Sequence, residues 1–218
     1  MNAIIVEPAQ PATASIIWLH GLGANGHDFE PIVSELPRKL TCHTRFIFPH
    51  APQRPISING GMTMRGWYDI IHLDLTLQQD DQGIYESEQL LKTYIHQESE
   101  AGIPNQRIIL AGFSQGGAIA LHTGLRYTMS LGGIMALSTY LPLSDQIEAE
   151  IHPTNRNISI FMGHGEFDPV IPLHQAQSSR KQLEQLGYPI QWHTYRMGHH
   201  VNYQEIQDIG HWLIQCLN

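Results

Sequence analysis

Short apolar runs recur along the chain, several of them apolar on successive residues, and the longer segments between them repeat apolar residues every three or four positions. Consecutive apolar residues are typical of strands buried on both faces of a sheet, whereas the longer period is typical of helices. The runs predict strands at residues 3–6, 15–19, 45–48, 107–111, 133–137, 158–162 and 191–195. The periodic segments predict helices at residues 85–98, 116–126, 173–186 and 203–216.

The alternation of these strands and helices indicates the class of fold. Strands joined through helices predict an α/β fold with a mostly parallel central sheet covered by helices on both faces. The first strand has a second option, antiparallel pairing at one edge. Asn202 and Glu205 form a capping box that would begin the last helix. A chain of 218 residues suits one domain with a sizeable core, and we expect a single domain over residues 1–218.

One segment, residues 49–82, interrupts the alternation. It is rich in apolar residues, and residues 71–77 alternate apolar and polar side chains, which predicts a small strand or hairpin with one apolar face. Irregular insertions of this length are often lids or binding loops. The alternative is that Trp67 and the leucines of this segment fill the core, and the pattern does not choose between the two.

Composition and charge argue against several classes of partner. The formal net charge is −8 and no cluster of Lys and Arg stands out, so we expect no contact with nucleic acid or an anionic membrane surface. Cys42 and Cys216 cannot form a disulfide framework. The chain shows neither a secretory signal nor an apolar run that spans a bilayer, so we expect a cytoplasmic protein without integral membrane contact.

The chain carries no motif for a metal or an organic cofactor. Its 14 histidines are scattered without an H-E-x-x-H motif, and its cysteines lack C-x-x-C spacing. A glycine-rich loop at residues 20–26 lacks the G-K-[ST] ending of a phosphate loop. We therefore predict neither a metal site nor a nucleotide site.

The sequence Gly112-Phe113-Ser114-Gln115-Gly116 lies between a predicted strand and a predicted helix. In that context a G-x-S-x-G motif forms a nucleophile elbow, a sharp turn that lifts the serine hydroxyl above the sheet. The glycines are needed because the strained serine leaves no room for side chains beside it. This pattern predicts that Ser114 is a nucleophile.

Two backbone N–H groups are candidates for an oxyanion hole. One belongs to Gln115, at the start of the helix that follows the serine. The other belongs to the glycine-rich loop at residues 20–26, where Leu22 is the expected donor. Together they would stabilise the negative charge of a tetrahedral intermediate.

A serine nucleophile needs a base and an acid that orients the base. In α/β-hydrolases both follow the serine, at the carboxyl ends of later strands. Asp168 is the expected acid, with Glu166 as its competitor in the same loop. The loop after the last predicted strand holds two histidines, His199 and His200, and the spacing does not choose between them.

Five motifs then occur in a familiar order: Leu19-His20-Gly21-Leu22-Gly23, Gly66-Trp67-Tyr68-Asp69, Gly112-Phe113-Ser114-Gln115-Gly116-Gly117, His164-Gly165 through Asp168-Pro169, and Met197-Gly198-His199. With these motifs the chain resembles the acyl-protein thioesterase and bacterial carboxylesterase group of α/β-hydrolases, also called the phospholipase/carboxylesterase family. The resemblance implies Ser114 as nucleophile, Asp168 as acid and His199 as base, with Leu22 and Gln115 in the oxyanion hole. It departs at His200, where many relatives carry other residues.

The expected function is hydrolysis of carboxylic esters, and of acyl thioesters, without a cofactor. The substrate would be a small acyl ester or thioester, or an acylated protein, and residues 62–77 are the candidate contact for its acyl chain, with Met64, Trp67, Leu73 and Leu75 as the named side chains. The resemblance also suggests a homodimer. Two alternatives stay open: a serine peptidase or amidase on the same fold, and a catalytically idle receptor for a small molecule.

Overall fold

The computed structural model describes residues 2–72 and 77–218, and its centre is a seven-stranded sheet. The strands are β1 (Ala3–Val6), β2 (Ala14–Leu19), β3 (Thr44–Pro49), β6 (Ile108–Phe113), β7 (Gly133–Leu137), β8 (Ile160–Gly165) and β9 (Ile190–Tyr195). Their order is β1-β3-β2-β6-β7-β8-β9; β1 pairs antiparallel with β3 at the edge, and the other pairs are parallel. The predicted mostly parallel sheet is confirmed, with strand ends shifted by a few residues.

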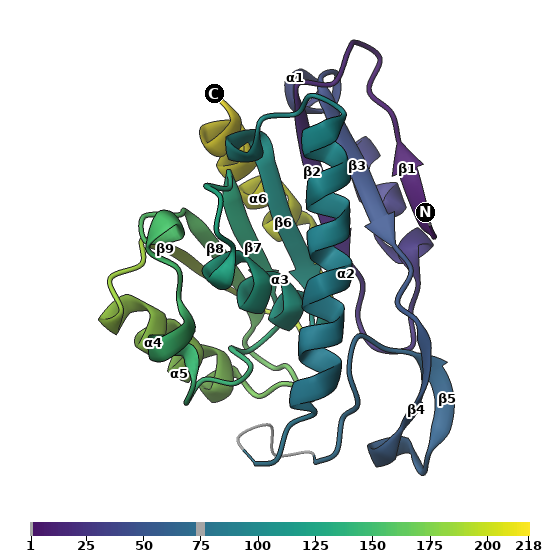
Figure 1. Ribbon diagram of the computed structural model, residues 1–218, viewed down its shortest axis with the longest axis vertical. Coiled ribbons are helices and arrows are strands. Elements are labelled where there is room, and N and C mark those ends of the chain that lie inside the picture. Colours follow the sequence, from purple (N-terminus) through teal and green to yellow (C-terminus); the bar gives the residue numbers. More distant parts are fainter. Residues whose placement is uncertain (1, 73–76) are drawn as a thin grey trace.

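Helices cover both faces of this sheet (Figure 1). The bounds are α1 (Arg38–Thr41), α2 (Asp81–Glu100), α3 (Gln115–Arg126), α4 (Ile147–Glu150), α5 (Leu173–Gln185) and α6 (Tyr203–Leu217). One apolar core packs α2, α3, α4 and α5 on one face, and a second core packs α1 and α6 on the other. Consecutive apolar residues in β2 and β6 serve both cores, since alternate side chains point to opposite faces.

The helix α2 begins at Asp81, earlier than its apolar pattern predicts. The Asp80 carboxylate accepts a hydrogen bond from the Gly83 N–H at 3.0 Å and so caps the first turn. The cap adds a polar turn that periodicity alone does not reveal.

Within the segment of residues 49–82, a hairpin lies at residues 53–65, where no hairpin was predicted. The strands β4 (Gln53–Ile56) and β5 (Met62–Arg65) pair antiparallel and project beyond the main sheet (Figure 1). Gly60 and Gly61 turn the chain with φ of 66° and 78°, values that favour glycine. Of the strand or hairpin predicted at 71–77, Ile71 and His72 have no strand structure, and residues 73–76 lie outside the described part of the chain.

Candidate active site

Ser114 lies in the turn between β6 and α3, in a backbone conformation that residues with side chains rarely adopt, φ 54° and ψ −123°. Its N–H donates to the Leu137 carbonyl at 2.8 Å, and its own carbonyl accepts from the Thr139 hydroxyl at 2.7 Å. A Cβ on Gly112 would lie 2.3 Å from the Gly116 backbone. The turn therefore closes only with glycine at this position, and the tight turn presents the serine hydroxyl at the carboxyl end of β6.

Three side chains from separate loops meet at this end of the sheet. His199 Nε2 lies 2.9 Å from Ser114 Oγ, and His199 Nδ1 lies 2.7 Å from Asp168 Oδ2. A carboxylate can only accept, so Nδ1 carries the proton and donates to Asp168. Nε2 is then left to accept the proton of the serine hydroxyl. The loops after β6, β8 and β9 supply the three residues, because parallel strands end at a common edge.

The carboxylate of Asp168 is fully buried, and both of its oxygens are engaged. Oδ1 accepts from the N–H groups of Val170 at 2.8 Å and Ile171 at 2.9 Å. Burial by itself would raise the pKa of Asp168, but the hydrogen bonds from His199 and from the backbone outweigh it, and the pKa is lowered. The ionised carboxylate therefore holds the imidazole in one tautomer.

The two alternatives left open by the spacing lie outside this hydrogen-bond chain. Glu166 is exposed, and its carboxylate accepts from the Thr194 hydroxyl at 3.4 Å. His200 is also exposed, and its backbone N–H donates to the Gly198 carbonyl at 3.1 Å. Proximity in sequence thus does not bring either side chain to the serine.

The glycine-rich loop after β2 is held by the buried side chain of His20. Its Nδ1 lies 2.7 Å from the Gly21 carbonyl oxygen, and its Nε2 accepts from the Ala51 N–H at 3.0 Å. Burial lowers the pKa of His20 to about 4, so the ring is neutral with its proton on Nδ1. In a trans peptide the C=O and N–H groups point in opposite directions. A donor fixed on the Gly21 carbonyl therefore also orients the Leu22 N–H.

The second expected donor, the Gln115 N–H, belongs to the first turn of α3, where N–H groups lack intrahelical acceptors. The Gln115 side chain ties this turn to the segment after β5. Its Oε1 accepts from the Trp67 N–H at 2.8 Å, and its Nε2 donates to the Tyr68 carbonyl at 2.6 Å. Leu22 and Gln115 thus both lie on backbone that buried side chains hold in place.

The expected contact of Trp67 with substrate is corrected by the structure. Its side chain is 1% exposed and lies in the core, as the alternative interpretation had it. The indole N–H donates to the His20 carbonyl at 2.8 Å. Because the polar end of the ring finds an acceptor inside, the whole indole can be buried at little cost. Trp67 therefore braces the loop that carries Leu22.

Of the other three residues predicted to contact the substrate, only Met64 lies in the described part of the chain. Met64, on β5, is half-buried, and its Sδ lies 3.7 Å from the place where a Cβ on Gly23 would be. The hairpin thus brings Met64 beside the loop of Leu22. Leu73 and Leu75 lie outside the described residues.

Glu205 lies in the first turn of α6 and has a buried carboxyl group. The sequence pattern predicted only that this residue belongs to a helix cap. Its N–H does donate to the Asn202 side chain at 2.9 Å, but its carboxyl points into the molecule, where a Cβ on Gly163 would lie 2.1 Å from Oε1. Burial, with a smaller effect from Asp208, raises the pKa of Glu205 to about 8. The side chain is therefore neutral at pH 7, between the strand that leads to Asp168 and the helix that follows His199.

Glu205→Gln is expected to flatten the pH dependence of stability. The folded protein keeps the Glu205 proton up to a pKa of about 8, whereas an exposed glutamate loses it near 4.5. Between these values the folded state holds one more proton, so stability falls as pH rises, by about 1.4 kcal/mol per pH unit from this group. Urea unfolding from pH 5 to 8 measures the slope. Glu148→Gln, at an exposed site, should keep the wild-type slope, and an equally steep slope in Glu205→Gln would contradict the assignment.

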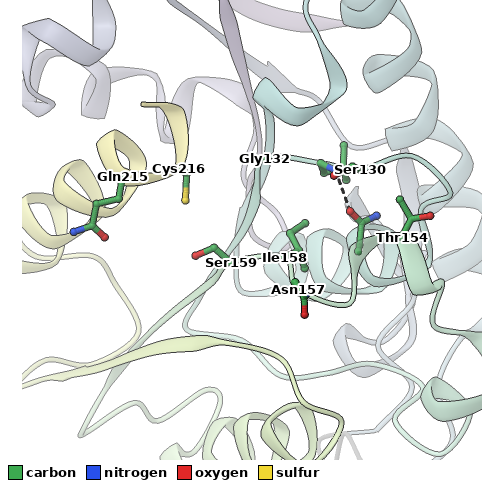
Figure 2. A pocket seen from close by; sticks show the side chains of 10 residues that line it. Ser130, Gly132, Thr154, Asn157, Ile158, Ser159, Gln215 and Cys216 are labelled. Carbon is green, nitrogen blue, oxygen red and sulfur yellow. Dashed lines mark hydrogen bonds between the residues drawn. The ribbon is translucent and has the colours of Figure 1, made fainter.

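A pocket lies at the opposite end of the sheet from Ser114. It has a volume of about 330 Å³ and is lined by Gly132, just before β7, and by Ser159, just before β8 (Figure 2). Asn155 forms part of its wall and accepts from the Leu131 N–H at 2.9 Å. None of the expected site residues lines it. The hydroxyl, imidazole and carboxylate groups described above lie at the other ends of these strands.

Within residues 2–72 and 77–218, no three His, Cys, Asp or Glu side chains are grouped as metal ligands. Among the helices of the same ranges, none has the length and apolar character needed to cross a bilayer.

This chain is similar in sequence and in fold to acyl-protein thioesterases. Acyl-protein thioesterase 1 of Gibberella zeae is 40% identical over 215 residues, covering 94% of this chain and 92% of the relative, and that of Yarrowia lipolytica is 41% identical over 212 residues, covering 94% and 93%. The crystal structure of Zea mays acyl-protein thioesterase 2 superposes with a TM-score of 0.90 at 27% identity and covers 99% of each chain. Arabidopsis thaliana SOBER1 gives 0.89 at 28% identity, covering 94% of this chain and 99% of that one. The Phospholipase/Carboxylesterase family model matches residues 1–217, so the chain belongs to this family of α/β-hydrolases.

Proposed function

We propose that this protein hydrolyses acyl thioesters and carboxylic esters, with Ser114 as nucleophile, His199 as base and Asp168 as the acid that orients it. The observation that carries the proposal is the continuous hydrogen-bond chain from the Ser114 hydroxyl through the imidazole to the buried Asp168 carboxylate. Its geometry suits acyl transfer, because one proton can move between serine and imidazole while the carboxylate stabilises the imidazolium.

In the first half of the reaction, Ser114 Oγ attacks the substrate carbonyl carbon while its proton passes to His199 Nε2. The carbonyl oxygen becomes an oxyanion, which the N–H groups of Leu22 and Gln115 stabilise. The C–S or C–O bond to the leaving group then breaks. His199 returns its proton to the leaving sulfur or oxygen, which departs as a thiol or alcohol and leaves an acyl-serine ester.

In the second half, water replaces the leaving group. His199 Nε2 takes a proton from water as its oxygen attacks the acyl carbon, and the same two N–H groups hold the second oxyanion. The bond to Ser114 Oγ breaks and His199 returns the proton to that oxygen. The products are a carboxylic acid and free enzyme.

The acyl chain is assigned to the side of Ser114 where Met64 and the β4–β5 hairpin approach Leu22. We include residues 49–82 in one catalytic domain with the rest of the chain, as its acyl-binding segment. The names of the relatives support an acylated protein as substrate. We propose small acyl esters as substrates alongside it. The cytoplasmic location, the homodimer and the contacts of Leu73 and Leu75 stay predictions.

A series of acyl thioesters and p-nitrophenyl esters of increasing chain length tests this function. We expect hydrolysis of both classes, with kcat/KM rising along the shorter members by about three-fold or more per added methylene that the site buries. A fluorophosphonate probe should label Ser114 in wild type. Faster turnover of matched anilides would favour the amidase alternative, and absence of both labelling and turnover would favour the idle receptor.

A further inference from the structure

A pocket of about 460 Å³ has His199 among the residues that line it. It is on the face of the sheet that carries α6, and its apolar wall includes Phe29, Phe113 and Val201. The rings of Phe113 and His199 are 4.7 Å apart, and those of Phe29 and Phe113 are 5.4 Å apart. The pocket therefore continues from the catalytic imidazole along a row of aromatic rings.

If the proposed function holds, the position of this pocket matches the leaving-group half of the substrate. His199 must return its proton to the leaving sulfur or oxygen, so the leaving group has to lie on the imidazole side of the scissile bond. The acyl chain is assigned to the other side, beside Leu22 and Met64. The pocket next to His199 is thus placed to receive the thiol or alcohol portion.

The charged residues that line the pocket indicate which kind of leaving group it would favour. Asp28 and Glu35 line it, and both are exposed. In the described residues neither takes part in an ion pair, whereas the nearby Glu30 is paired with His27 at 2.7 Å. No lysine or arginine is among the lining residues of the described chain. Among the described residues, the lining of the pocket thus combines two carboxylates outside any ion pair with the aromatic side chains of Phe29 and Phe113, and this combination favours a cation.

We infer that this pocket binds the leaving group and selects acyl thioesters and esters whose leaving group carries a positive charge. Two sources share this chemistry: a small thiol or alcohol that bears an ammonium group, and an acylated cysteine with a lysine or arginine next to it. The acidic charge of the whole chain, −8, adds long-range attraction for either source.

An isosteric pair of thioesters tests the charge preference. S-Butyryl thiocholine carries a quaternary ammonium, and the S-(3,3-dimethylbutyl) ester of thiobutyric acid has a carbon in place of its nitrogen. We expect wild-type kcat/KM to be about ten-fold higher for the cationic member at low ionic strength, the size that two exposed carboxylates provide. The ratio should fall as salt is added.

The variant Asp28→Asn/Glu35→Gln should bring this ratio close to one. The control variant Asp145→Asn/Glu148→Gln removes the same charge at exposed positions away from the pocket and should keep the wild-type ratio. Equal kcat/KM for the two thioesters in wild type would overturn the inference, as would a ratio that the double variant leaves unchanged. If wild type hydrolyses neither thioester, it is the proposed function that fails.

A second pair of substrates identifies the source of the cation. These are S-butyryl cysteine peptides that differ only in lysine or glutamine beside the acylated cysteine. A preference for the lysine peptide that disappears in Asp28→Asn/Glu35→Gln supports an acylated protein as the source. The thiocholine preference alone supports a small cationic leaving group.

Discussion

Ser114→Ala is expected to lower kcat for a short p-nitrophenyl ester by between about 10⁴- and 10⁶-fold, because the members of a catalytic triad act as a unit. The substitution removes the only atom, Oγ, that forms the acyl-enzyme. It leaves the hydrogen bonds of the Ser114 backbone to Leu137 and Thr139 in place, so the elbow should persist. Steady-state kinetics with matched circular dichroism spectra measures the loss.

A serine at the opposite end of the sheet provides the matched control. Ser130 lines the pocket shown in Figure 2, near the amino ends of β7 and β8. Ser130→Ala should keep wild-type kcat and KM. Loss of fluorophosphonate labelling in Ser114→Ala, with labelling retained in Ser130→Ala, is the accompanying result. Turnover in Ser114→Ala close to that of wild type would refute the assignment of the nucleophile.

His199→Ala should lower kcat by about 10⁴-fold or more, whereas His200→Ala should keep the larger part of the activity. The two residues are adjacent, but only His199 makes hydrogen bonds to both Ser114 Oγ and Asp168 Oδ2. Without that imidazole the serine proton has no acceptor, and the leaving group has no proton donor. The pair of variants thus separates the base from its neighbour under identical assay conditions.

Two measurements keep the comparison clear of folding effects. His200→Ala should unfold in urea with a midpoint near that of wild type, since its side chain is exposed. His199→Ala removes a hydrogen bond to the buried Asp168 carboxylate and should unfold at a lower midpoint, so its activity is measured at a temperature where urea curves show it fully folded. The rate of fluorophosphonate labelling should fall with kcat in His199→Ala, because the same proton transfer activates the serine toward the probe. Similar losses in both histidine variants would contradict the assignment of His199 alone.

Much of the framework was readable from local pattern. Short apolar runs predicted the seven strands of the main sheet, and several of these runs are apolar at every position because their strands are buried on both faces. The glycines around Ser114 predicted the nucleophile elbow, because a strained turn excludes larger residues. The chain order of serine, acid and histidine then placed the candidates at one edge, as parallel strands require.

The segment of residues 49–82 was harder to interpret. The signal for the β4–β5 hairpin was present in Asn59-Gly60-Gly61, but its strands are half-exposed and carry no clear alternation. Trp67 has the same apolar character whether it lines a groove or fills the core. Its burial depended on a distant partner, the carbonyl of His20, which lies 47 residues away along the chain.

Residue type and spacing along the chain therefore predicted the fold, a candidate nucleophile and a short list of candidates for the acid and the base. Three-dimensional contacts then singled out Asp168 and His199 from exposed neighbours with the same chemistry, because hydrogen bonds depend on direction and distance. The neutral carboxyl of Glu205 and the acidic pocket beside His199 also emerged only on folding. Burial and charge around a group are set by residues that are remote in sequence, so no local pattern contains them.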